Sequence, residues 1–209
     1  MSVKYNLPIV SVGLSHCTGN LLASGEAGQR SIDETIKGLS IVKELGATCA
    51  LHTLGSLQED IYYDDAFANT VDSLKRIAPA ARELDVVLAV EQVWNGFLFS
   101  PLEMKRLLED VNDDYIGYYF DPGNMAVFQY PHHWVRILGR YLKMMHLKDF
   151  KGGALDGCWL ALLQGDIDYK KIMTELRNIG YDGPLLSEVD LSQASLEETS
   201  RTIDKIMSL

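Results

Sequence analysis

Two short, almost wholly apolar runs in the middle of the sequence each end in a single carboxylate. Val86 to Val90 precedes Glu91, and Ile116 to Phe120 precedes Asp121. Continuous apolar runs of this length are typical of strands in a parallel sheet that is covered on both faces. Burying a charged residue at the end of such a strand costs free energy unless a partner compensates the charge. Two carboxylates at successive strand ends therefore indicate a shared partner, most simply a metal ion.

The alternation of apolar runs and helical patterns continues along the whole chain without a break in composition. Six runs are predicted to form strands: Ile9 to Leu14, Thr48 to Leu51, Val86 to Val90, Ile116 to Phe120, Leu142 to Met145 and Pro184 to Ser187. Helices are predicted from capping boxes at Ser31 and Ser100, over Ile61 to Leu84 and Trp134 to Tyr141, from a cap at Asp168, and over Ser195 to Leu209, with Met1 to Leu7 as the tail of a further helix. Strands that alternate with helices favour a parallel α/β sheet with right-handed crossovers. Because no linker interrupts the pattern, we expect one domain over residues 1–209.

Each predicted strand has a potential metal ligand at or just after its end. These residues are His16, His52, Glu91, Asp121, His146 and Glu188. Functional sites of parallel α/β folds are built at the carboxyl ends of the strands, where the loops are free of core packing. One imidazole and three carboxylates, from the last four of these residues, favour Mn²⁺ or Mg²⁺, with Co²⁺ and Zn²⁺ as alternatives. Taken alone, Glu91 or Asp121 could instead accept backbone N–H groups at a helix start, and His16 or His52 could be a hydrogen-bonded loop histidine or a substrate contact.

The charge and the cysteines of the chain argue against several classes of protein. Lys and Arg number 19 against 29 Asp and Glu, and the resulting net charge of −10 repels phosphate backbones and acidic membrane surfaces. No apolar run approaches the roughly 20 residues of a membrane span. Three cysteines without a CxxC pair, behind an N-terminus unlike a signal peptide, predict reduced thiols in a cytoplasmic protein. We therefore expect a small-molecule substrate and neither nucleic acid nor membrane as a partner.

Four segments carry a family resemblance: AVEQ, YYFDPGN, MHLKDF and LLSEVD. Together with SHCTGNLL and LLQGDIDY, they resemble motifs of the xylose isomerase-like TIM-barrel superfamily, which contains sugar isomerases and epimerases as well as inosose dehydratase, hydroxypyruvate isomerase and endonuclease IV. The resemblance implies that Glu91, Asp121, His146 and Glu188 bind one divalent metal. It further implies that Glu91 and Glu188 face each other across a sugar or keto-polyol. There they would catalyse isomerisation or epimerisation by proton transfer through a metal-bound enediolate.

Further residues near the strand ends are expected to contact the substrate. They are His16, His52, Trp94, Asn124 and Lys148. Lys148 could neutralise an oxyanion or a substrate carboxylate, or it could pair with Asp149. The aromatic loop residue Trp159 could line the pocket or serve plain packing. Because the sequence contains no glycine-rich phosphate loop, a free sugar or keto-acid is preferred to a sugar phosphate.

Two positions depart from the pattern of the resembling family. Asn124 stands where the epimerases and endonuclease IV often have histidine, and asparagine is a poor ligand for transition metals. This difference and the negative charge argue against a tri-zinc phosphodiesterase. Phe97 stands where the ketose 3-epimerases carry a second glutamate, so that specificity is not supported by the sequence.

A TIM barrel contains eight βα units, whereas six are visible in this sequence. The resemblance places the first strand of the chain at the third strand of the family barrel, so we expect an incomplete barrel with two open sheet edges. A homo-oligomer is expected to cover these edges. Two alternatives to an isomerase or epimerase stay open: a dehydratase of the inosose type on the same metal site, and a non-catalytic truncated barrel.

Overall fold

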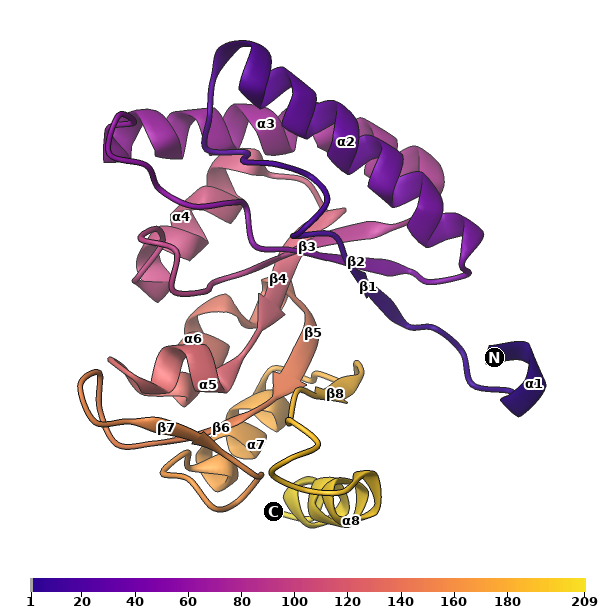
Figure 1. Ribbon diagram of the computed structural model, residues 1–209, viewed down its shortest axis with the longest axis vertical. Helices are drawn as coiled ribbons and strands as arrows, with labels where there is room; N and C mark the ends of the chain where they lie inside the picture. Colours follow the sequence, from indigo (N-terminus) through magenta and orange to yellow (C-terminus); the bar gives the residue numbers. More distant parts are fainter. Residues whose placement is uncertain (1) are drawn as a thin grey trace. The chain divides into compact units, whose positions relative to one another are not determined.

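The computed structural model describes residues 2–209, which divide into two compact units (Figure 1). The first unit ends at Tyr119, and the second covers Phe120–Leu209. The N-terminal segment contains the short helix α1 (Ser2–Tyr5). Met1, the first residue of the predicted helix tail, lies outside the described residues. Among residues 2–209, no helix combines the length and the apolar character that a membrane span requires.

The first unit is a parallel sheet with helices packed beside it. Strands β1 (Ser11–Gly13), β2 (Cys49–His52), β3 (Val87–Glu91) and β4 (Ile116–Phe120) pair in this order, each parallel to the next. The helices are α2 (Gly25–Glu44), α3 (Tyr63–Leu84) and α4 (Pro101–Val111), and α3 packs against the other two. Figure 1 shows α2 and α3 on the same side of β2 and β3. The predicted strand–helix alternation is therefore present in this unit.

Burial in the first unit follows the apolar runs of the sequence. All residues of β2 and β4 are buried, and β3 is buried from Leu88 to Glu91. Strands that lack an exposed face need no polar alternation, which is why these runs are continuous. The buried strand ends bring Glu91 to the carboxyl end of β3 in this unit.

The second unit continues the alternation of helices with parallel strands. Its parallel strands β5 (Leu142–Leu147) and β8 (Leu185–Ser187) pair so that His146 lies opposite Leu186. An antiparallel hairpin of β6 (Asp149–Lys151) and β7 (Cys158–Leu160) follows β5. The helices are α5 (Pro122–Ala126), α6 (Pro131–Leu138) with the 3-10 turn η1 (Gly139–Tyr141), α7 (Tyr169–Asn178) and α8 (Leu196–Met207). Helix α7 packs against both α6 and α8.

The predicted helix caps are confirmed in three places and wrong in one. Ser100 accepts a hydrogen bond from the Leu102 N–H at the start of α4, Asp168 caps α7, and Ser195 forms a reciprocal capping box with Glu198 in α8. The cap at Ser31 is wrong because α2 begins at Gly25. Inside that helix the Ser31 hydroxyl donates to the Ala27 carbonyl (3.0 Å) and accepts from the Asn20 N–H (2.9 Å). The Ser-x-x-Glu pattern at Ser31 therefore holds the preceding loop rather than starting the helix.

Candidate metal centre

Asp121 is fixed at the end of β4 by the first turn of the helix that follows it. Its side chain is fully buried, and its Oδ1 accepts hydrogen bonds from the N–H groups of Gly123 (2.7 Å) and Asn124 (3.2 Å). Pro122 occupies the first helical position, where no N–H group is needed. The cap thus holds Oδ1 in place and leaves the second oxygen, Oδ2, to face the neighbouring strand ends of the second unit.

His146 and Glu188 lie at adjacent strand ends of the second unit. His146 is the last but one residue of β5, and the Glu188 N–H donates to the Leu147 carbonyl (3.0 Å) directly after β8. His146 Nδ1 lies 3.4 Å from Glu188 Oε2 and 4.0 Å from Asp121 Oδ2. The potential ligand atoms of Asp121, His146 and Glu188 all lie within 4.8 Å of one another. A convergent imidazole and two carboxylates are donors that fit a divalent cation.

Lys148 joins the same cluster from the residue after β5. Its Nζ lies 2.9 Å from Glu188 Oε2 and 3.5 Å from Asp121 Oδ2. The ammonium also lies 4.5 Å from the ring centroid of Trp159, within the range of a cation–π interaction. Positive charge beside two carboxylates reduces the free-energy cost of burying Asp121.

The environment of Glu188 keeps its carboxylate ionised. Partial burial raises the pKa of Glu188, but the hydrogen bond and charge of Lys148, together with the charge of His146, outweigh that effect and lower the pKa below its usual range. At neutral pH the side chain therefore carries the negative charge that a metal ligand or a general base requires. About half of the side chain is exposed, so a substrate could reach it.

A cavity of about 590 Å³ opens in front of Lys148 and Glu188. Trp159 from β7 lines one wall, and Gln193 donates a hydrogen bond from its side chain to the Trp159 carbonyl (2.8 Å). The predicted alternative of plain packing for Trp159 is thus replaced by a place in the wall of a polar cavity. An aromatic wall beside hydrogen-bonding groups suits a small polar ligand.

Gly123 allows the turn after Asp121 to approach this wall closely. A β-carbon at Gly123 would lie 2.8 Å from Trp159 Cζ3 and 3.0 Å from Lys148 Cγ. Both distances are shorter than ordinary carbon–carbon contacts, so a side chain here would displace Trp159 or the stem of Lys148. The glycine therefore contributes to the position of the ammonium beside the carboxylates.

The substitution Gly123→Ala is expected to destabilise the fold by about 1–3 kcal/mol, as overpacking of a close contact does. It should also shift the fluorescence emission of Trp159, which has to move. Chemical denaturation and emission spectra measure both effects. Gly153→Ala is the matched control, because its β-carbon would meet nothing closer than 3.4 Å. Equal stability of the two variants would contradict the close approach.

Asp149 has a structural role in the second unit. Its carboxylate is buried and accepts hydrogen bonds from the N–H groups of Phe150 (2.9 Å) and Gly165 (3.1 Å). Burial raises the pKa of Asp149 against the opposing effect of these backbone donors. Asp149 thus ties the start of the hairpin to the loop before α7. Of the two roles open for Lys148, its contacts with Asp121 and Glu188 favour a place in the site over pairing with Asp149.

Four predicted site residues belong to the first unit. Glu91 ends β3 and is 6% exposed, and its register partner in β4 is Tyr119. Trp94 lies in the loop after β3 and is exposed, as is His16 after β1. Phe97, close to Trp94 in the same loop, is buried and packs on the rings of Tyr63 and Phe67. The position that departs from the 3-epimerase pattern is therefore a core residue.

His52 is a hydrogen-bonded residue inside the first unit. Its Nδ1 accepts from the Leu54 N–H (2.8 Å), so the proton of the neutral ring is on Nε2, which lies 2.7 Å from the Thr18 hydroxyl. The Thr18 hydroxyl in turn donates to the Leu14 carbonyl. Complete burial lowers the pKa of His52 to about 4. These contacts favour the structural alternative for His52 over a substrate contact.

Acid is expected to destabilise the protein through His52. Because the folded-state pKa of about 4 lies below the ordinary value of 6.5, the unfolded chain binds the proton more tightly. The stabilisation is complete above pH 6.5 and is lost between pH 6.5 and 4, by about 3 kcal/mol. Urea denaturation across this range should show a shallower pH dependence for His52→Gln than for the wild type. His133→Gln, at an exposed histidine, is the control; equal slopes for all three proteins would contradict the assignment.

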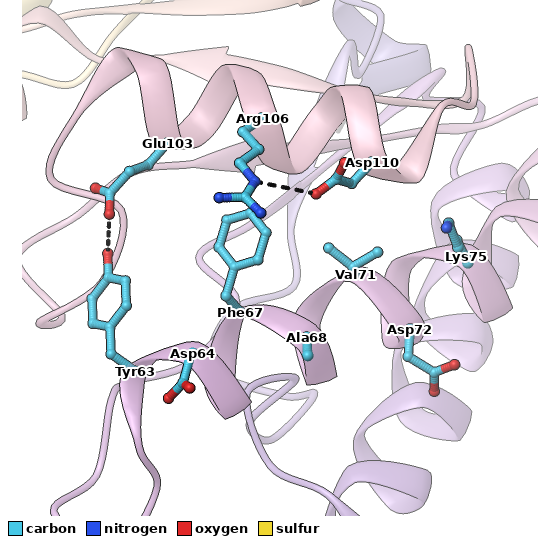
Figure 2. A pocket seen from close by; sticks show the side chains of 10 residues that line it. All are labelled: Tyr63, Asp64, Phe67, Ala68, Val71, Asp72, Lys75, Glu103, Arg106 and Asp110. Atoms are coloured by element: carbon cyan, nitrogen blue, oxygen red, sulfur yellow. Dashed lines mark hydrogen bonds and ion pairs between the residues drawn. The ribbon is translucent and has the colours of Figure 1, made fainter.

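A larger groove of about 730 Å³ lies between α3 and α4, away from every predicted site residue (Figure 2). The Tyr63 hydroxyl donates to Glu103 (2.9 Å), and Arg106 lies 3.7 Å from Asp110 and over the ring of Phe67. Burial, with a smaller contribution from Glu103, raises the pKa of Tyr63 to about 12, so the phenol stays protonated. These pairs account for the groove as packing between two helices.

The sequence did not predict the elements that complete the candidate site. Helix α5 and the β6–β7 hairpin are five and three residues per element, too short for a periodic pattern. The prediction ended the fifth strand at Met145, whereas β5 continues to Leu147 and so contains His146. The Asp-Pro-Gly sequence at Asp121 was the available signal for α5, because it combines a cap, a first-turn proline and a glycine.

A comparison with protein families gives one match over nearly the whole chain. The family model described as xylose isomerase-like TIM barrel matches residues 1–206. This confirms the predicted fold class, a parallel α/β structure of the TIM-barrel type with six of the eight strands.

Individual relatives are distant in sequence and similar in fold. An inosose dehydratase from Lacticaseibacillus casei is 24% identical over 152 residues, which are 64% of this chain and 50% of that protein. The crystal structure of a D-tagatose 3-epimerase-like protein has a TM-score of 0.84 at 18% identity, covering 99% of this chain and 79% of that chain. The IOLI protein, crystallised with a zinc atom, has a TM-score of 0.81 at 17% identity, covering 96% and 77%. The chain spans about half the length of the curated relatives that it matches.

Proposed function

The chain belongs to the xylose isomerase-like TIM-barrel family, and from that premise we propose that it is a divalent-metal-dependent isomerase or epimerase of sugars or keto-polyols. The observation that carries the proposal is the convergence of Asp121, His146 and Glu188 at the strand ends of the second unit. Isomerases and epimerases among the similar structures, such as the D-tagatose 3-epimerase-like protein, support the reaction class.

Asp121, His146 and Glu188 would hold the metal in this proposal, with Glu91 as the fourth ligand. Their mixed imidazole and carboxylate donors fit Mn²⁺ or Mg²⁺, with Co²⁺ or Zn²⁺ as alternatives, and the zinc of the IOLI protein supports a divalent ion. When bound, such an ion polarises the carbonyl and hydroxyl oxygens of the substrate and lowers the barrier to removing an adjacent proton.

The side chains of the protein would carry the proton transfer itself. Glu188 is ionised and partly exposed, so it can remove a proton from the carbon next to the substrate carbonyl. Glu91 would return a proton from the opposite face of the resulting enediolate. Lys148 and the Asn124 side chain would contact substrate oxygens, as would the exposed His16 and Trp94. We leave His52 out of this set because it is fully buried.

A second candidate is a dehydratase of the inosose type, which the match to the Lacticaseibacillus casei inosose dehydratase favours. The first step would be the same proton removal by a carboxylate. The second would expel a hydroxyl group as water instead of returning a proton to carbon. The same residues serve both reactions, so product analysis is needed to separate them.

Hydrogen exchange in deuterated water tests the proposal. The Mn²⁺-loaded protein is incubated with a panel of free ketoses, keto-acids and inososes, and products are identified by NMR and mass spectrometry. Deuterium at the carbon next to the carbonyl, with an isomer or epimer as product, would support the first candidate, and loss of water would support the second. A protein that binds Mn²⁺ but exchanges no proton with any of these compounds would contradict both and favour a non-catalytic barrel.

Self-association through the open sheet edges stays a prediction from the sequence. Sedimentation equilibrium at micromolar concentration should give a mass that is a multiple of 23.4 kDa. A single species of 23.4 kDa with full turnover would contradict it.

A further inference from the structure

Lys148 contacts the same two oxygen atoms that the candidate metal ligands bring together. Its Nζ lies 2.9 Å from Glu188 Oε2 and 3.5 Å from Asp121 Oδ2. The imidazole atom His146 Nδ1 approaches these same oxygens, at 3.4 Å and 4.0 Å. An ammonium and a metal ion that use one pair of oxygens would lie within a few ångströms of each other, where their charges repel strongly in a partly buried site.

From this shared pair of oxygens we propose that the Lys148 ammonium is a built-in counter-ion that competes with the divalent metal for Asp121 and Glu188. The inference rests on the metal site of the proposed function. Metal binding displaces the ammonium from the two carboxylates, and the affinity for the metal includes the cost of that displacement. Lys148 is thus a positioning residue of the metal centre.

The burial of Asp121 explains why such a counter-ion is needed. The Asp121 side chain is fully buried, and two backbone N–H groups bind its other oxygen. A buried carboxylate without a cation beside it destabilises the fold. The ammonium stabilises the pair of carboxylates as the protein folds, and the metal then takes over that role.

The surroundings of Lys148 provide a place for the displaced ammonium. The Trp159 ring centroid is 4.5 Å from Nζ, and the stem of Lys148 runs along Gly123, where a β-carbon would lie 3.0 Å from Cγ. The stem is therefore held while the ammonium can turn toward the aromatic ring and the 590 Å³ cavity. Displacement would leave the positive charge in the cavity, facing a ligand.

The test is the affinity of Lys148→Met for Mn²⁺ alone, measured by isothermal titration calorimetry at constant ionic strength. Methionine keeps a flexible apolar stem and removes the charge. We expect Lys148→Met to bind Mn²⁺ at least about tenfold more tightly than the wild type, because one nearby positive charge is gone. Lys151→Met, at an exposed lysine three residues along the chain, removes the same charge and should leave the affinity unchanged. Lys148→Gln is the second variant if Lys148→Met does not fold.

A fluorescence titration with Mg²⁺ reports the displacement directly. Mg²⁺ should shift the Trp159 emission in the wild type, and both Lys148→Met and Trp159→Phe should lose that shift. Equal or weaker Mn²⁺ binding by Lys148→Met would overturn the inference while leaving the proposed function in place. Binding by Lys148→Met but not by the wild type would support it. Absence of binding in both proteins would overturn the metal site and the inference together.

Discussion

Replacing Asp121 by asparagine is expected to lower the affinity for Mn²⁺ by about a hundredfold or more, since even outer-shell changes at metal sites cost ten- to a hundredfold. The asparagine side-chain oxygen can still accept the N–H groups of Gly123 and Asn124, because asparagine caps helices about as well as aspartate. The fold should therefore be retained while the second, negatively charged oxygen is lost. Calorimetric titration with Mn²⁺ measures the affinity, and circular dichroism checks the fold.

The control for Asp121→Asn is Asp204→Asn, which removes one charge from an exposed position of α8. Its affinity for Mn²⁺ should equal that of the wild type. If Asp121→Asn also bound Mn²⁺ as tightly as the wild type, Asp121 would not be a ligand and the metal centre would have to lie elsewhere.

Replacing Glu188 by glutamine is expected to slow proton exchange into the substrate by about a hundredfold to ten-thousandfold, the usual contribution of a general base. Glutamine has the same shape but cannot accept the proton. Lys148 and His146 lower the pKa of Glu188 against the opposing effect of burial, so the wild-type base is ionised at neutral pH. The rate is measured by NMR in deuterated water at saturating Mn²⁺, so that weaker metal binding does not limit it.

Glu197→Gln, at an exposed glutamate in the first turn of α8, is the matched control and should exchange at the wild-type rate. Full exchange activity in Glu188→Gln would exclude the two-glutamate mechanism. A partial loss that disappears at higher Mn²⁺ concentration would assign Glu188 to metal binding alone.

The parallel strands could be predicted from the sequence because burial on both faces leaves a simple trace. Ile116 to Phe120 is predicted and observed with the same bounds, and the strand ends at Asp121 and Glu188 follow directly. Strand ends of parallel sheets share one edge, so residues far apart in the sequence could be grouped from the positions of the strand ends alone. The three ligand types in the second unit come from this rule.

The remaining features depend on contacts that no local pattern records. Ser31 has a capping sequence, yet its hydroxyl bonds to Ala27 and Asn20 inside a longer helix. His52 follows a strand as a metal ligand would, but its ring is held by Leu54 and Thr18. The contact of Lys148 with two carboxylates and one indole ring requires the hairpin, which the sequence did not predict.

The most direct test of the metal centre is anomalous diffraction from crystals of the protein soaked in Mn²⁺. The account predicts one strong peak within coordination distance of Asp121 Oδ2, His146 Nδ1 and Glu188 Oε2, with the Glu91 carboxylate as the fourth ligand. Ordered side chains at these positions without a peak at saturating Mn²⁺, or a peak bound by other residues alone, would contradict it.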